Sequence, residues 1–186
     1  MVTKTETTEI ITEPKLQQGV APSLKRWLKH FFYMPASKRY FSKQDQTKIA
    51  QAVKEAEHGH VGEIQVVIEG YIPSGVAYRQ NTRLRARQLF AELGVWDTAY
   101  NSGVLLYLNL CEQVVEIVID RGIDQATEQH EWQTICDHMV EQLKAKNYTQ
   151  GVIQGVFEIG QILDQFYDDQ IEDLENELGN APIILN

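Results

Sequence analysis

The spacing of apolar residues between positions 42 and 168 predicts an alternation of helices and strands. Apolar side chains recur every three or four residues in four segments, which we expect to be helices: 42–59, 86–93, 132–143 and 149–166. Short runs rich in β-branched residues predict three strands: 63–69, 104–110 and 114–119. The longest apolar run, at 104–108, is typical of a buried strand.

The order of these elements restricts the topology of the sheet. A helix lies between the first two strands, so they form a parallel, right-handed βαβ unit. Only Cys111, Glu112 and Gln113 separate the last two strands, which must therefore pair as an antiparallel hairpin. The expected fold class is α/β, a three-layer-like sandwich in which helices flank a small mixed β-sheet.

Composition divides the chain into four parts. Residues 1–20 are rich in Thr, Glu and Gln, and we expect them to be disordered because they bury too little apolar surface. Residues 21–41 are a basic aromatic extension, and residues 42–168 are the α/β domain. Residues 169–186 are an acidic tail, expected to be a solvated helix end or an extended arm. The alternative is that it pairs with the basic segment 24–43.

Overall charge and cysteine content exclude several classes of protein. The 186 residues include 17 Lys and Arg against 26 Asp and Glu, and this net charge of −9 argues against nucleic acid as a partner. Two cysteines, Cys111 and Cys136, lack the spacing of a zinc site or a disulfide framework. The sequence shows neither a signal peptide nor a transmembrane segment, so we expect a cytoplasmic protein.

Residues 24–43 depart from this acidic character. They contain six Lys and Arg residues and no acid, with aromatic side chains interleaved, and Pro35 is expected to end a short helix there. Such a segment suits a protein partner or an anionic membrane surface. Alternatively, its aromatic side chains cover the core of the chain's own domain while its charges face water. The candidate partner-binding residues are Lys25, Arg26, Trp27, Lys29, Phe31 and Phe32.

Acidic residues follow or precede the predicted strands at positions that the topology brings to one edge of the sheet. Glu63 opens the first strand, Asp97 precedes the second, and Asp120 and Asp124 follow the third. Carboxylates gathered in this way favour a hard cation, calcium or magnesium. The alternative is that they cap turns, pair with Arg121 or point into solvent.

Three sequence blocks resemble the TPM domain family. They read FAELGVWDT at 90–98, NSGVLLYL at 101–108 and VEIVIDRGI at 115–123. The resemblance extends over residues 42–168, and the flanking segments 26–32 and 176–185 look like the stand-alone cytosolic bacterial branch of that family. It implies an α/β sandwich with a small mixed sheet and a divalent cation at a loop cluster.

What the resemblance implies about activity varies within the family. Some members are acid phosphatases, whereas others are non-enzymatic partners in photosystem II repair or auxiliary subunits of receptors. This chain carries Asn101–Ser102 where exported members have Asp-Asn, and Asp120–Arg121 where they have glycine and an aromatic residue. These departures change the set of metal ligands. The missing signal peptide and terminal membrane helix agree with a cytoplasmic location.

Two functions follow from these observations. The first is a non-catalytic binding or auxiliary module that binds calcium or magnesium. The alternative is a metal-dependent phosphatase for phosphate monoesters, in which Arg121 contacts the phosphate. The chain has no glycine-rich phosphate loop and no nucleophile motif, so nucleophilic catalysis has no candidate residue. No general base other than the metal carboxylates is evident, which favours the first function. The candidate metal ligands in either case are Glu63, Asp97, Asp120 and Asp124.

Overall fold

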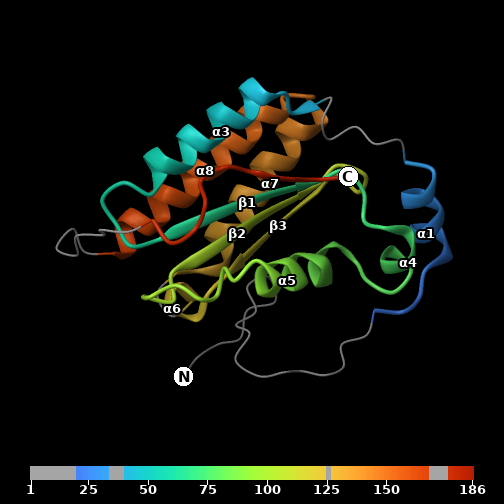
Figure 1. The fold of residues 1–186 in the computed structure, drawn as a ribbon, viewed down its shortest axis with the longest axis horizontal. Coiled ribbons are helices and arrows are strands. Elements are labelled where there is room, and N and C mark those ends of the chain that lie inside the picture. Colours follow the sequence, from blue (N-terminus) through green and yellow to red (C-terminus); the bar gives the residue numbers. More distant parts are fainter. Residues whose placement is uncertain (1–19, 34–39, 125–126, 168–175) are drawn as a thin grey trace.

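The computed structural model describes residues 20–33, 40–124, 127–167 and 176–186, and it confirms a mixed α/β fold (Figure 1). In chain order the elements are α1 (Leu24–Phe31), α3 (Lys43–Ala56), β1 (Glu63–Glu69), α4 (Ser74–Ala77), α5 (Thr82–Glu92), β2 (Gly103–Asn109), β3 (Val114–Ile119), α6 (Arg121–Asp124), α7 (Gln129–Lys144), α8 (Tyr148–Phe166) and β4 (Ile183–Leu185). The predicted disordered segment lies outside the described residues except for Val20, as do positions 34–39 of the basic extension.

The sheet has four strands in the order β3-β2-β1-β4. Strands β1 and β2 are parallel, with Glu63 opposite Gly103 and Glu69 opposite Asn109, while β2 and β3 form the antiparallel hairpin. Both features agree with the sequence prediction. The fourth strand was not predicted.

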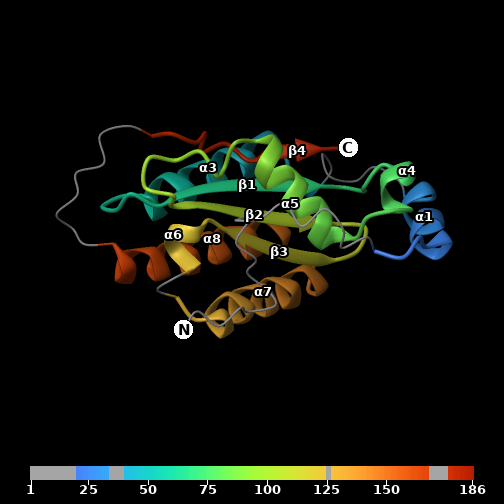
Figure 2. The same cartoon turned by 90° about the horizontal axis from the view of Figure 1, so that it is seen from below.

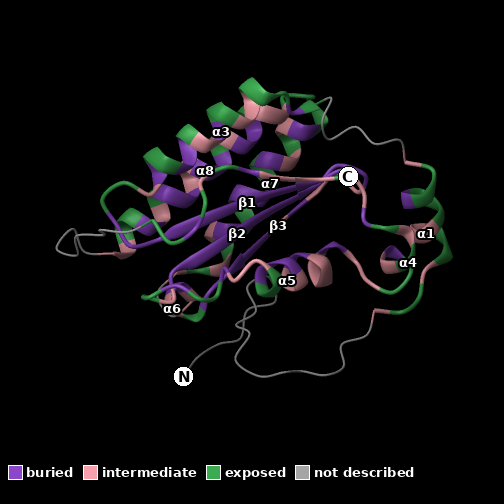
Figure 3. Cartoon of the chain, viewed as in Figure 1, coloured by how far each residue is buried: buried purple, intermediate pink, exposed green. Residues whose placement is uncertain are grey.

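Helices cover the sheet on both faces (Figures 1 and 2). Side chains of α3, α7 and α8 form the larger apolar core with alternate strand residues such as Ile64 and Leu106. On the opposite face, α5 packs against Val67, Leu105 and Tyr107. The central strands are therefore buried throughout (Figure 3), which explains the continuous apolar run 104–108 in β2. In β1 the burial includes Glu63, Gln65 and Glu69.

Local sequence signals place the ends of the helices. Ser42 caps α3 in a capping box with Asp45. The hydrogen bonds with Ser42 lower the pKa of the Asp45 carboxyl. Gly94 follows α5 with a φ of 69°, the left-handed conformation expected at a helix end.

The C-terminal residues 176–186 form a strap along the open edge of β1, where the sequence predicted an acidic tail. Strand β4 pairs in parallel with β1, Val67 lying opposite Ile183 and Glu69 opposite Leu185. The Leu178 side chain is buried against the α5 face of the sheet. Residues 169–175 of the predicted tail lie outside the described residues. Among the helices that the structure describes, none combines the length and apolarity needed to cross a bilayer.

Candidate functional site

The topology brings the beginnings of β1 and β2 and the end of β3 to one edge of the sheet, as the sequence predicted. The Glu63 amide donates to the Ser102 carbonyl at 3.2 Å, and the Asp120 amide donates to the Gly103 carbonyl at 2.9 Å. Glu63 and Asp120 therefore belong to the same end of the sheet. Their carboxylates, however, have different environments.

The Glu63 carboxylate holds the C-terminal strap. It is buried, and its two oxygens accept hydrogen bonds from the backbone amides of Glu177 and Leu178, each at 3.0 Å. The carboxylate of Glu177 in turn accepts from the Ala99 amide. Glu63 thus has a structural role that the sequence analysis did not foresee, because the strap itself was not predicted.

The Asp120 carboxylate is only partly engaged. Its Oδ1 accepts a hydrogen bond from the Arg121 amide at 2.6 Å, whereas Oδ2 is buried without a hydrogen-bond partner among the described residues. Burial raises the pKa of Asp120, against the opposing effect of Arg121. Burial also raises the pKa of Tyr167 to about 12, and the negative charge of Asp120 adds to this shift. Asp120 is therefore a carboxylate whose charge lacks full compensation.

The remaining predicted residues do not complete a metal centre. Asp97 is exposed on the loop before β2, and Asp124 is half-buried on α6. The Arg121 guanidinium donates to Asn101 Oδ1 at 3.0 and 3.2 Å. Within the part of the chain that the structure describes, no three His, Cys, Asp or Glu residues are arranged to hold a metal ion. The described side chains thus do not fit the expected multi-carboxylate site, and cation binding stays a prediction.

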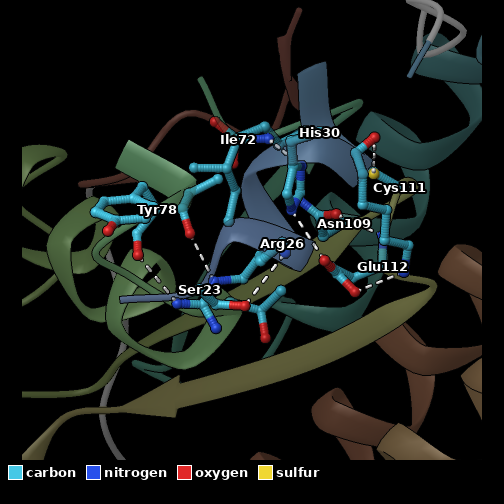
Figure 4. A network of polar contacts seen from close by, with 12 residues as sticks. Ser23, Arg26, His30, Ile72, Tyr78, Asn109, Cys111 and Glu112 are labelled. Carbon is cyan, nitrogen blue, oxygen red and sulfur yellow. Dashed lines mark hydrogen bonds and ion pairs between the residues drawn. The ribbon is translucent and has the colours of Figure 1, made fainter. Parts of the chain in front are cut away.

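A second candidate surface lies at the opposite end of the sheet, where α1 is attached to the body of the domain by its polar side (Figure 4). The Ser23 amide donates to the Tyr78 carbonyl at 3.0 Å, and Arg26 Nε donates to the Ala77 carbonyl at 2.6 Å. The Ser23 side chain also caps α1. The first turns of α1 are therefore fixed to α4 through backbone carbonyls.

His30 attaches the last turn of α1. Its side chain is fully buried, Nδ1 accepts a hydrogen bond from the Ile72 amide at 3.1 Å, and Nε2 lies 3.0 Å from Glu112 Oε1. Lys29 Nζ contacts the other oxygen of Glu112 at 2.6 Å. Burial lowers the pKa of His30, while the charge of Glu112 opposes that shift.

The opposite side of α1 exposes its apolar residues. We call Leu24, Leu28, Phe31 and Phe32 the outward face, and their exposed fractions are 62%, 40%, 57% and 72%. Trp27 stacks on Phe31 with 5.0 Å between ring centroids, and Phe32 contacts Phe31 edge-on. The extension does pack on its own domain. The alternative that its aromatic side chains cover the core is not what the structure shows, because Phe31 and Phe32 point away from the domain. Ser23, Arg26 and His30 face the protein, whereas Lys25 and Lys29 are exposed.

The attachment of α1 involves residues that sequence reasoning missed, namely Ser23, His30, Ile72, Tyr78 and Glu112. One signal was available, because Ser23, Arg26 and His30 have the spacing of one helix face. That spacing separates a polar face from an apolar one. It does not determine which of the two faces the body of the protein.

Comparison with known proteins finds a matching family model and similar solved structures. A model of the TPM domain matches residues 36–162. The NMR structure of the BA42 protein from Bizionia argentinensis is similar, with a TM-score of 0.68 and 25% identity over 77% of this chain and 94% of that one. The N-terminal domain of the cg2496 protein from Corynebacterium glutamicum has a TM-score of 0.51 and 14% identity, over 74% of this chain and 84% of that one, and it shows a shared fold alone. No curated protein matches the chain.

Proposed function

This chain belongs to the TPM domain family, and we propose that it is a non-catalytic module that docks on an anionic bilayer surface through the outward face of α1. The observation that carries the proposal is the orientation of α1, whose polar side is hydrogen-bonded to the domain while its apolar side chains face solvent. The domain is thus a rigid carrier for an amphipathic helix.

The exposure of α1 has an energetic cost that a bilayer interface would remove. Burying a phenylalanine side chain contributes about 1.5–3 kcal/mol, and Phe31 and Phe32 are both more than half exposed. Amphipathic helices that lie in a bilayer interface bury Phe, Leu and Trp side chains at the boundary between headgroups and acyl chains. The outward face therefore suits the boundary between headgroups and acyl chains.

The charge distribution favours an anionic surface. Lys25 and Lys29 are exposed on α1, and Arg79 is exposed just after α4. Residues 24–43 contain six of the 17 Lys and Arg and none of the 26 acidic residues, so this segment is basic in an otherwise acidic chain. An anionic leaflet would attract this end and repel the rest, which orients the outward face toward the membrane. The alternative is that a protein partner binds the outward face. A vesicle-binding experiment distinguishes a bilayer from a protein partner.

Replacing Phe31 and Phe32 together by serine is expected to weaken binding to vesicles of phosphatidylcholine and phosphatidylglycerol at least about tenfold. Losing the burial of two phenylalanines removes more than 1.4 kcal/mol, which corresponds to a factor of about ten. Co-sedimentation measures the effect. The control is Trp96→Ser with Tyr100→Ser, because these exposed aromatic residues lie at the other end of the sheet.

The expected pattern is retained binding in the control, loss in the α1 variant, and weak binding of all three proteins to vesicles of phosphatidylcholine alone. A wild-type protein that does not sediment with anionic vesicles would overturn the bilayer proposal and leave a protein partner as the occupant. Equal losses in both variants would show that exposed aromatic residues bind lipid without specificity.

We call the end of the sheet where β1 and β2 begin and β3 ends the strand-end edge. We further propose that it binds calcium or magnesium weakly through Asp120, whose buried Oδ2 lacks a hydrogen-bond partner among the described residues. Calcium titration followed by amide NMR is expected to shift Asp97, Asn101 and Asp120–Asp124, and Asp120→Asn should abolish these shifts. Asp137→Asn is a matched control on α7 and should leave them unchanged. Identical responses from the wild type and Asp120→Asn would contradict the assignment.

The alternative function, a metal-dependent phosphatase, lacks comparable support. Its predicted phosphate contact, Arg121, is hydrogen-bonded to Asn101, and Glu63 holds the strap. The non-catalytic module therefore remains the better proposal.

A further inference from the structure

Ser23, Arg26 and His30 contact the body of the domain from one side of α1 (Figure 4), and His30 is the buried member of that set. Lys29 makes a further contact, with Glu112. Ser23 and Arg26 contact backbone carbonyls near α4. His30 connects α1 to two further segments, the turn after β1 through Ile72 and the turn after β2 through Glu112. The last turn of α1 is thus attached through this imidazole, together with the Lys29–Glu112 ion pair and the Cys111 thiol, which donates to the Lys29 carbonyl.

The two contacts of His30 define its protonation state. Nδ1 accepts the Ile72 amide hydrogen, so it carries no proton, and the proton of the neutral ring resides on Nε2, which faces Glu112. A second proton would have to bind Nδ1. It would then point at the Ile72 N–H, and two donors would face each other in a fully buried position.

Charged groups around His30 act in both directions. Glu112 and Glu69 favour the protonated ring, whereas burial and the neighbouring Lys29 disfavour it, and burial is the largest effect. Glu69 itself is paired with Arg85, and the adjacent Cys111 thiol has its pKa raised to about 11 by burial, so it is neutral in this range. The pKa of attached His30 therefore lies below its usual 6.5.

The sign of the pH dependence follows from this shift. A released His30 would be solvated and would bind a proton more readily than the attached one, so lowering the pH below about 6.5 favours release. The attachment is complete above that pH and is lost as the pH falls through the lower pKa of the buried ring.

We infer that His30 is an acid-sensitive latch, which holds α1 on the domain when neutral and releases it when protonated, and that release strengthens binding to anionic bilayers. The second part rests on the proposed function. In the attached state Arg26 is bound to carbonyls and Lys29 to Glu112. Release would free both side chains, together with the charged imidazole, for lipid phosphates.

The test compares the wild type with His30→Asn between pH 7.5 and 5.5. The asparagine oxygen can replace Nδ1 as the acceptor for the Ile72 amide but does not titrate. The Ile72 amide resonance is expected to shift in the wild type with a midpoint below 6.5 and to stay constant in His30→Asn. Binding to vesicles containing phosphatidylglycerol should rise about tenfold more in the wild type than in His30→Asn over this range.

The outcomes separate the latch from the bilayer role. Equal titration of Ile72 in both proteins would overturn the latch. Titration in the wild type alone, with no vesicle binding by either protein, would support the latch and overturn the proposed function. If His30→Asn does not fold, Glu112→Gln serves instead, because removing the negative charge should move the Ile72 midpoint to lower pH. An unchanged midpoint would then contradict the latch.

Discussion

Replacing Glu69 by alanine is expected to lower the free energy of unfolding by about 3–5 kcal/mol, measured by urea denaturation. Glu69 is fully buried at the end of β1 and accepts three hydrogen bonds from Arg85, at 2.9, 3.2 and 3.4 Å. It also accepts the Tyr107 hydroxyl at 2.6 Å. Removing the carboxylate leaves a largely buried guanidinium without its charge partner, which is the costly way to break a buried ion pair.

The same network reaches α1, because Asn109 donates to Tyr107 and accepts from the amide of Glu112. Loss of Glu69 should therefore loosen the turn that carries Glu112 in addition to the core. Glu92→Ala is the matched control, since Glu92 is exposed and lies 3.9 Å from Arg85. It should change stability by less than about 1 kcal/mol. A comparable loss in both variants would show that Arg85 does not depend on the buried carboxylate.

The apolar pattern was sufficient to predict the central part of the fold. Continuous runs such as 104–108 belong to strands covered on both faces, and the short connection Cys111–Gln113 admits only a hairpin. Once the topology was fixed, Glu63 and Asp120 had to lie at the same edge. These inferences depend on local geometry and chain connectivity, both of which are encoded in the sequence.

The remaining features depend on contacts between distant segments. Pairing of β4 with β1 unites residues more than a hundred positions apart, and nothing local in Ile183–Leu185 specifies its partner strand. The role of Glu63 changes with that pairing, because its carboxylate then holds the strap. The orientation of α1 likewise results from the fit of His30 between Ile72 and Glu112. Amphipathic spacing alone left both orientations open, with the apolar side either outward or against the core.

Gly103→Ala is expected to destabilise the protein by about 3 kcal/mol or more, because a Cβ atom there would lie 1.9 Å from the backbone carbonyl oxygen of Val95. Val95 is buried and its amide donates to Phe90, so its carbonyl cannot shift without disturbing the end of α5. Urea denaturation checks the loss. Gly75→Ala is the control, since a Cβ atom at Gly75 meets nothing within 4 Å and a helical alanine there should be neutral or slightly stabilising.

Gly103→Ala is also expected to change the geometry of the strand-end edge. The Gly103 carbonyl accepts the Asp120 amide, and the adjacent Ser102 carbonyl accepts the Glu63 amide. Displacing Gly103 must therefore move the two carboxylates relative to each other, and calcium-induced amide shifts at Asp120–Asp124 should weaken in whatever fraction stays folded. If Gly103→Ala is as stable as Gly75→Ala, the loop before β2 can shift to accommodate the added Cβ atom at little cost. The close approach of Val95 to β2 would then not be what positions the edge.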